Sequence, residues 1–391
     1  MSLEPAYAVA FTDWLGCACA GARERAATAM RSVGEGVVAE TAFAATAGHV
    51  LDFDDTFADG LAHVSAACAP AALVVSARLG LSLGTALDAY ADAYEAMSAV
   101  VEASHPALYD AGWHPTAVCG PIGAVVAASR LLELTEPQRE NALALALLRA
   151  GGTRGAFGSD GKAIQVGLAA AAGVQAALLA HAGATVDLRA IHGPVGFEMV
   201  VGASVPRRAF AGTRDGGGTP PAIERNWIKL HPSCLGTHSP IDAATQATEE
   251  AGRLDGGPLE VVVHPLARQA AHLDAVSDGL SAKFSIPYCV AHTFMFGAPG
   301  VRDFAGVDPG VSARAELVSV EVDESLPEFG AVLTESGGEL ARVEAPKGSP
   351  ERPIDASELA QKMSDLVGDR LDGLLDDLER PASDVRTAAG L

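Results

Sequence analysis

The strongest constraint on the fold is the first half of the chain, where apolar residues recur at helical spacing and no convincing strand pattern occurs. Pro70 predicts the start of a helix over 71–79, because proline is favoured in a first helical turn. Thr135 and Gln138 have the spacing of a capping box. Further candidate helices cover residues 5–20, 36–51, 86–104, 120–132, 138–149 and 162–182. These segments are rich in small residues that let helices approach closely, so an all-helical domain is predicted.

After about residue 215 the pattern changes to that of a smaller α+β region. One helix is predicted over 241–252. Valine-rich runs after it predict four strands, at 259–264, 316–322, 331–334 and 340–343. Polar segments at 213–221 and 346–353 are typical of linkers, and a final amphipathic helix is predicted over 355–378. The predicted fold class is mainly α, with an all-helical domain formed by residues 1–214 and 346–391 and an α+β domain formed by residues 215–345.

The composition argues against several classes of function. A formal net charge of −22 opposes binding to nucleic acid or to an anionic membrane. No apolar run reaches the length and purity of a membrane span, and no basic signal-peptide segment is evident. The six cysteines lack zinc-site spacing, and free thiols fit a reducing cytoplasm. We therefore expect a cytoplasmic protein without nucleic-acid or membrane partners.

One polar stretch stands out from its Ala-rich surroundings. Residues 49–56 read His-Val-Leu-Asp-Phe-Asp-Asp-Thr, and His63 follows closely. The stretch contains three carboxylates, a hydroxyl and an imidazole, which are costly to bury without partners. Runs of Ala, Val and Leu on both sides favour a polar pocket over an exposed surface.

Other interpretations of this acidic stretch stay open from the residues alone. Asp52, Asp54, Asp55 and Asp59 could bind a divalent cation, although carboxylates at one helix end rarely complete an octahedral shell. Asp-Phe-Asp-Asp also matches the general-acid motif of terpene cyclases, but those sites need aromatic walls, and only 5% of the residues are aromatic. The stretch could also be a solvated helix terminus.

Four further segments carry groups suited to proton transfer or anion binding, and they are Gly112–Thr116, Gly158–Lys162, Lys229–His238 and Lys283–Tyr288. In the first, His114 precedes a proline that keeps it out of helical geometry at the start of a helix. Lysine is scarce, and three of the five lysines in the chain lie in these segments. Placing rare cations in polar turns of a very acidic protein favours a local anion site.

Together these segments resemble the MmgE/PrpD family, which includes 2-methylcitrate dehydratase, cis-aconitate decarboxylase and iminodisuccinate epimerase. The matching pieces run in family order between about residues 10 and 310, and they are residues 49–56, 112–116, 161–167, 193–197, 229–238 and 282–288. The combination is specific for the family and not for one activity within it.

The resemblance implies that the α+β domain acts as a lid on the all-helical domain, to which the C-terminal helix returns. It also implies a homodimer, a site between the domains, and neither a metal nor an organic cofactor. The candidate catalytic residues carried over from the family's decarboxylases are Asp52, His63, His114, Lys162 and Tyr288, and the candidate substrate-binding residues are Thr56, Lys229 and Cys234. Cys234 takes a position that holds histidine in those decarboxylases.

From this resemblance we expect a cofactor-free lyase, namely a dehydratase of a 2-methylcitrate-like di- or tricarboxylic acid. The shared step of the family is proton transfer at a carbon next to a carboxylate or imine. The histidines supply a base and an acid, the lysines offset the carboxylate charge, and Asp52 can orient a nearby imidazole and raise its pKa. An isomerase or epimerase, or a decarboxylase, of an iminodisuccinate- or cis-aconitate-like acid is the alternative activity. A catalytically idle scaffold or binding protein is the alternative of another class.

Overall fold

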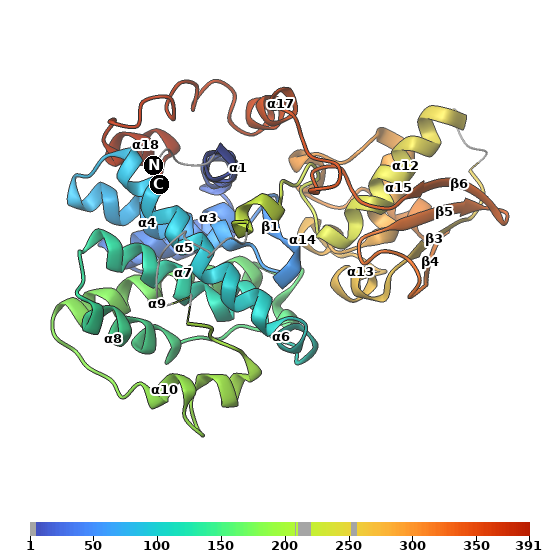
Figure 1. The fold of residues 1–391 in the computed structure, drawn as a ribbon. Helices are drawn as coiled ribbons and strands as arrows, with labels where there is room; N and C mark the ends of the chain where they lie inside the picture. The colour runs from blue at the N-terminus through green and yellow to red at the C-terminus, as the bar shows by residue number, and fades with distance from the viewer. Residues whose placement is uncertain (1–4, 208, 210–219, 252–255) are drawn as a thin grey trace.

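The structure is a computed structural model that describes residues 5–207, 209, 220–251 and 256–391. Helices from the first half of the chain gather in one part of the molecule, and a sheet with its own helices forms a second part (Figure 1). The first and last helices, α1 and α18, both lie on the helical part. A mainly α fold with a smaller α+β region is thereby confirmed.

The helical part is built from Ala-rich helices packed at short range. Their bounds are α1 (Pro5–Gly21), α2 (Arg25–Ser32), α3 (Val37–His49), α4 (Val64–Leu79), α5 (Leu83–Ser104), α6 (Ala107–Asp110), α7 (Pro115–Leu131), α8 (Glu136–Leu147), α9 (Asp160–His181) and α10 (Arg189–His192). α7 packs against α9, α4 and α5. A Cβ at Gly173 of α9 would lie 2.5 Å from the carbonyl oxygen of Pro121 in α7. Small residues therefore set the distance between these helices.

The prediction that Pro70 starts a helix is wrong. α4 begins at Val64 and contains Pro70, with His63 as its N-cap residue. Proline removes one backbone donor from a helix interior, but every residue from Val64 to Ser76 is buried, so side-chain packing outweighs the lost hydrogen bond. The earlier start matters because it places His63 at a helix N-terminus.

The second part is a four-stranded sheet covered by helices. The strand order is β4-β3-β5-β6, with β3 and β4 parallel and the other neighbours antiparallel. Val261 and Val263 of β3 are buried while Glu260 is exposed, which gives the sheet one apolar face. α12 packs on β5 and β6, and α15 packs on β4. The bounds are β3 (Leu259–Val263), β4 (Val318–Val322), β5 (Ala331–Glu335), β6 (Gly338–Val343), α12 (His238–Ala251), α13 (Pro265–Ala270), α14 (Gly279–Ala282), α15 (Ile286–Phe296) and α16 (Pro309–Ala315).

A short strand pair joins the polar stretch to the chain that enters the second part. β1 (Thr56–Phe57) pairs antiparallel with β2 (Asn226–Trp227), close to the middle of the view in Figure 1. This pairing places the polar stretch beside the segment that leads into α12. The short helical turns are η1 (Ala58–Gly60), η2 (Arg154–Ala156), η3 (Glu198–Gly202), η4 (Ala222–Arg225), η5 (Leu235–Thr237) and η6 (Val301–Phe304).

The C-terminal helix predicted over 355–378 is shorter in the structure. α17 (Ala356–Val367) packs against α1, and a separate helix α18 (Ala382–Ala389) packs against α4. Gly368 ends α17 with a φ of +61°, a conformation that glycine adopts without steric cost. The chain therefore returns to the helical part in two short helices rather than one long helix.

The division into the two predicted domains stays a prediction. Its boundary near residue 214, and most of the linker predicted at 213–221, lie outside the described residues. One described helix, α9, is long and apolar enough to cross a membrane, and 67% of its apolar window is buried inside the protein. Burial of this extent is typical of a core helix.

Candidate active site

Six of the eight predicted site residues line one small cavity. They are Asp52, Thr56, His63, His114, Lys162 and Cys234. The cavity has a volume of about 50 Å³, which is room for a few water molecules. Much of its remaining wall is apolar and includes Leu61, Tyr109, Phe157, Leu235, Phe284 and Phe329. The cavity therefore combines imidazoles and an ion pair with an apolar wall.

Three helix N-termini deliver the imidazoles and the cation of the cavity. His63 is the N-cap residue of α4, and His114 is the N-cap residue of α7. Pro115 at the first position of α7 keeps His114 extended, with a φ of −91° and a ψ of 102°. Lys162 lies in the first turn of α9, after the N-cap residue Ser159. Because a helix N-terminus carries a partial positive charge, the three ends together favour an anionic ligand.

Asp52 is the anionic centre of a lysine cluster. Its Oδ1 accepts hydrogen bonds from Lys162 Nζ at 2.8 Å and from Lys229 Nζ at 2.7 Å. Burial by itself would raise the pKa of Asp52, but these two ammonium groups hold it well below its ordinary value. Lys229 is buried and contacts Asp52 without lining the cavity, so it supports the carboxylate and does not face a ligand there.

Asp54 orients His63 without lining the cavity itself. Its Oδ2 lies 3.1 Å from Nδ1 of His63 and 2.9 Å from Nδ1 of His49. An ionised carboxylate only accepts hydrogen bonds, so we assign a proton to both Nδ1 atoms. Burial would raise the pKa of Asp54, but the two imidazoles hold it well below its ordinary value. This assignment leaves Nε2 of His63 unprotonated, with a free lone pair. Nε2 lies 3.7 Å from Oδ1 of Asp52.

Both imidazoles bound to Asp54 are neutral near pH 7. Burial, together with the charge of Lys162, lowers the pKa of His63 to about 4, although the charge of Asp54 opposes this shift. Burial also lowers the pKa of His49. A neutral imidazole with a free Nε2 lone pair is a proton acceptor.

His114 is held by an amide instead of a carboxylate. Nε2 of Gln165 lies 2.6 Å from Nδ1 of His114. The backbone of Thr153 fixes this amide, because its N–H donates to Oε1 at 3.0 Å and its carbonyl accepts from Nε2 at 3.2 Å. Nε2 of an amide only donates, so Nδ1 of His114 accepts and its Nε2 carries the proton. Burial lowers the pKa of His114 well below its ordinary value, so this imidazole is neutral as well.

The four aspartates between residues 52 and 59 have separate partners. Asp52 binds lysines and Asp54 binds histidines. Asp55 accepts hydrogen bonds from a serine and an asparagine, and burial raises its pKa well above the ordinary value. Asp59 pairs with an arginine. A cation site shared by all four carboxylates, which the sequence left open, is therefore not formed in the described part of the chain.

One group in the described residues could still hold a metal ion. The ligand atoms of His49, Asp54 and His63 all lie within 4.8 Å of one another, and all three residues are buried. Two imidazoles and a carboxylate would suit a transition-metal ion. In the structure the imidazoles instead lie at direct hydrogen-bonding distance from the carboxylate. Independence from metal remains a prediction that chelation tests.

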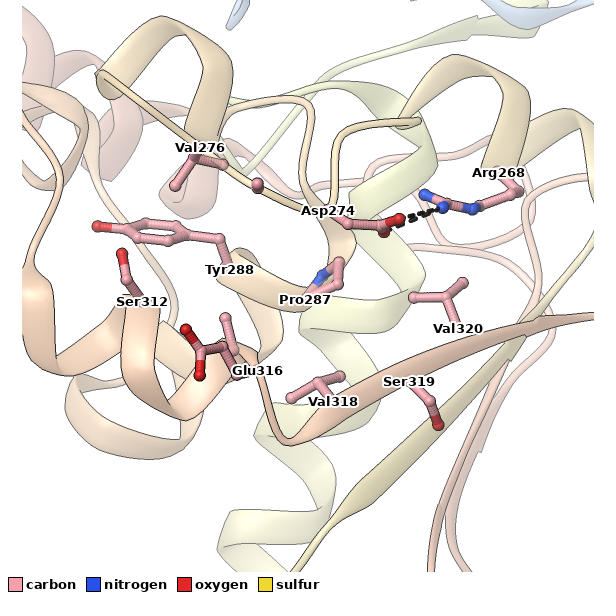
Figure 2. A pocket seen from close by; sticks show the side chains of 12 residues that line it. Arg268, Asp274, Val276, Pro287, Tyr288, Ser312, Glu316, Val318, Ser319 and Val320 are labelled. Atoms are coloured by element: carbon pink, nitrogen blue, oxygen red, sulfur yellow. Dashed lines mark hydrogen bonds and ion pairs between the residues drawn. The ribbon is translucent and has the colours of Figure 1, made fainter.

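Tyr288 does not reach this cavity, contrary to the prediction. It lies in the first turn of α15, and its hydroxyl accepts a hydrogen bond from the backbone N–H of Asp308 at 3.0 Å. Its ring points toward Ser312 in a separate cavity of about 550 Å³, beside an arginine–aspartate ion pair (Figure 2). Phe284 lines the small cavity instead. α15 begins after Ser285, and this start of a helix turns Tyr288 away from the side that Phe284 faces.

Three residues with direct roles in this geometry were not among the predicted site residues. His49 and Asp54 lie in the polar stretch itself, where no local pattern distinguishes one carboxylate from its neighbours. Gln165 lies one helical turn after Lys162, and only the fold brings it to His114. The spacing of Lys162 and Gln165 on one helix face is the signal that could have identified it.

Two protein-family models match the chain. The MmgE/PrpD N-terminal domain matches residues 6–207, and the MmgE/PrpD C-terminal domain matches residues 231–378. The two matches together cover most of the chain and include every residue that lines the cavity. A search of curated proteins found no match.

Proposed function

The chain belongs to the MmgE/PrpD family, a family of enzymes, and on this premise we propose that it is a cofactor-free dehydratase of a 2-methylcitrate-like di- or tricarboxylic acid. The observation that carries the proposal is that two imidazoles in one cavity have opposite partners at Nδ1, a carboxylate for His63 and an amide nitrogen for His114, which assigns them opposite tautomers. One presents a lone pair and the other presents an N–H. Elimination of water needs such a pair, because one proton leaves carbon and another reaches the departing hydroxyl.

In the proposed reaction, Nε2 of His63 takes the proton from the carbon next to a substrate carboxylate. The C–H electron pair forms the C=C bond, the C–O bond breaks, and Nε2–H of His114 gives its proton to the leaving hydroxyl, which departs as water. His114 is then an imidazolate whose Nδ1 still accepts the hydrogen bond from Gln165, and it regains a proton from the His63 imidazolium through solvent after the product leaves. The imidazolium that forms at His63 lies between the carboxylates of Asp52 and Asp54. Both carboxylates stabilise that positive charge.

The ionisation of the substrate favours this direction of proton transfer. A pKa of about 4 makes His63 neutral but weakly basic in the empty cavity. A substrate with two or three carboxylates adds negative charge beside His63, which raises the pKa of that imidazole toward neutrality. Lys162 and the three helix N-termini offset the charge on the carboxylates themselves.

The apolar wall supports a substrate that carries an alkyl group as well as carboxylates. Phe157, Phe284 and Phe329 line the cavity with Leu235, while Lys162 and the histidines supply its polar groups. Burial of one methylene in such a wall contributes about 0.8 kcal/mol to binding. A 2-methylcitrate-like acid should therefore bind more tightly than the analogue that lacks the methyl group.

The small size of the cavity has a consequence for binding. At about 50 Å³ it is too small for a tricarboxylic acid. We propose that the α+β part moves as a lid to admit the substrate and that the protein works as a homodimer, as the family resemblance implies. We also propose that it works in the cytoplasm, where its free thiols would stay reduced.

Incubation with 2-methylcitrate-like and citrate-like acids in deuterated water tests the proposed function. An alkene product with deuterium exchange at the adjacent carbon supports a dehydratase. Exchange with inversion and no alkene supports an epimerase, which the same pair of imidazoles would suit, and release of carbon dioxide supports a decarboxylase. Absence of exchange with every acid tried supports an idle scaffold. Activity should survive exhaustive chelation, and restoration only by an added metal ion would revive the metal interpretation of His49, Asp54 and His63.

A further inference from the structure

Three buried lysines bind three consecutive backbone carbonyls in the loop that carries Asp52. The carbonyls of residues 51, 52 and 53 accept hydrogen bonds, in that order, from Lys283 at 2.5 Å, Lys229 at 2.9 Å and Lys362 at 2.7 Å. The three lysines come from distant positions in the chain, and each is 4% exposed or less. The backbone on both sides of the Asp52 carboxylate is therefore held by ammonium groups.

Each of these ammonium groups also binds the segment that leads into the α+β part. Lys283 donates to the carbonyl of Pro232, Lys229 donates to the carbonyl of Ser233, and Lys362 donates to the carbonyl of Lys229, all at 2.8 Å. Two stretches of backbone, 51–53 and 229–233, thus face each other with three ammonium groups between them. We refer to Lys229, Lys283 and Lys362 in this arrangement as the lysine clamp.

We propose that Lys283 and Lys362 are positioning residues, which hold Asp52 in its active geometry and make that geometry depend on the placement of the segment at 229–233. The catalytic consequence rests on the proposed function. Neither lysine lines the small cavity, so neither acts on a substrate there directly.

Backbone strain at Asp52 is the first reason for this inference. Asp52 has a φ of +52°, which is disfavoured for a residue other than glycine and persists only where the surroundings enforce it. The clamped carbonyls of residues 51 and 53 lie on both sides of it. A relaxed loop would carry the Asp52 carboxylate away from Lys162 and from Nε2 of His63.

The partners of Lys283 are the second reason. In the described residues its ammonium group has two carbonyl acceptors and the ring of Phe304 at 4.9 Å, and no ion pair. Burying an ammonium group without a carboxylate partner is costly. Methionine of similar length would avoid that cost, so a buried cation at this position indicates a requirement for its hydrogen bonds.

Hydrogen–deuterium exchange tests the clamp without any substrate. Lys283→Met, and Lys362→Met combined with Asp13→Asn so that no buried carboxylate is left unpaired, should each speed amide exchange in residues 50–57 and 229–235, with little change in the rest of the helical part. Lys347→Met is the matched control, because Lys347 also binds a backbone carbonyl, that of Pro353 at 3.0 Å, but lies outside the clamp. Exchange rates at 50–57 equal to those of the wild type would overturn the proposal. This outcome does not depend on which substrate the protein converts.

The catalytic consequence is tested by turnover and its pH profile. Lys283→Met should lower kcat tenfold or more and change KM less, because the substrate pocket keeps its lining. Wild-type kcat should fall above about pH 8, where Lys283 loses its charge and its hydrogen bonds weaken, and the variant should lack that decline. Equal profiles would contradict the role of Lys283. The charged groups that face or influence Lys283 are Glu24, Arg25, Asp52, Asp160, Lys162, Lys229, Asp278 and Arg302.

A double variant separates positioning by Lys362 from simple charge pairing. Lys362 also lies 2.5 Å from Oδ1 of the buried Asp13, so Lys362→Met alone leaves a buried carboxylate unpaired. Asp13→Asn combined with Lys362→Met removes both charges and should recover the thermal stability of the wild type but not its kcat. Recovery of kcat in the double variant would show that Lys362 only neutralises Asp13 and would overturn its positioning role.

Discussion

The two sides of the small cavity each carry a histidine, and the two imidazoles differ in the hydrogen-bond partner at Nδ1. His63 and His114 are both N-cap residues, both buried, and both neutral near pH 7. His63 has a carboxylate at its Nδ1, and His114 has an amide nitrogen there. One partner only accepts and the other only donates, so the two imidazoles take opposite tautomers.

This difference shows how one residue type can serve both halves of an elimination. Burial sets the protonation state of each imidazole, since it disfavours the charged form on both sides of the cavity. The hydrogen-bond partner then decides which nitrogen carries the proton. Asp54 and Gln165 are therefore as important to the proposed roles as the histidines themselves.

The largest expected effect comes from removing the proposed base. His63→Ala should reduce kcat by about 10²–10⁴-fold, the usual contribution of a positioned acid or base. His114→Ala should reduce kcat less, because water can donate a proton to a leaving hydroxyl more readily than it can accept one from carbon. His181→Ala is the control, since His181 is exposed at the end of α9. A larger loss for His114→Ala than for His63→Ala would reverse the assignment of roles.

The next effect comes from removing the carboxylate that orients His63. Asp54→Asn should lower kcat by about 10²-fold, because an amide carries no charge and offers only one accepting oxygen to the two Nδ1–H groups, so the tautomer of His63 is no longer held. Asp55→Asn is the matched control: Asp55 is also buried, its raised pKa favours the neutral form, and it contacts neither histidine. Steady-state kinetics of both variants would check this, and equal losses would show that Asp54 acts through packing alone.

A smaller effect is expected on the amide side. Gln165→Glu places a carboxylate at Nδ1 of His114, which reverses its tautomer and raises its pKa. We expect kcat to fall about tenfold, the equivalent of about 1.4 kcal/mol, which is within the usual contribution of one hydrogen bond. The Gln165→Met variant removes the hydrogen bond without reversing its direction, so its kcat should fall less. A Gln165→Glu variant with wild-type kcat would show that the tautomer of His114 does not matter.

The smallest effect is on stability at acidic pH. His49, His63 and His114 have pKa values lowered by burial in the folded protein, so below pH 6.5 the unfolded chain binds more protons than the folded one. Their contribution to stability is present above pH 6.5 and is lost as pH falls toward about 4, the pKa of His63. Urea midpoints between pH 7.5 and 4.5 would check this. Asp13 and Asp55, whose pKa values are raised by burial, act in the opposite direction, so the midpoints of the wild type are compared with those of His114→Ala, in which the fall should be smaller. An equal fall in both proteins contradicts burial of a neutral imidazole at His114.

Much of the site could be predicted because its chemistry lies in short local patterns. The polar stretch after α3, His114 before a proline and Lys162 in a Gly-rich turn are visible in the sequence, and the fold brings them to one cavity. The mainly α fold with a smaller α+β region was predictable for a similar reason. Helical spacing and valine-rich runs report local structure directly.

What the sequence could not predict depends on contacts between distant segments. The choice of Asp54 for the histidines and Asp52 for the lysines follows from the positive φ at Asp52 and from lysines far along the chain. Tyr288 was misplaced because a helix starts just before it and turns its side chain. Pro70 was misread because burial along α4 outweighs the local rule for proline.

The most direct test of the central claim is nitrogen-15 NMR of the imidazole rings near pH 7, with resonances assigned through His63→Ala and His114→Ala. Protonated and unprotonated ring nitrogens have well-separated shifts. We predict a proton on Nδ1 and a lone pair on Nε2 in His63, and the reverse in His114. The same tautomer in both rings, or a charged imidazolium at either one, would contradict the division of labour proposed for this cavity.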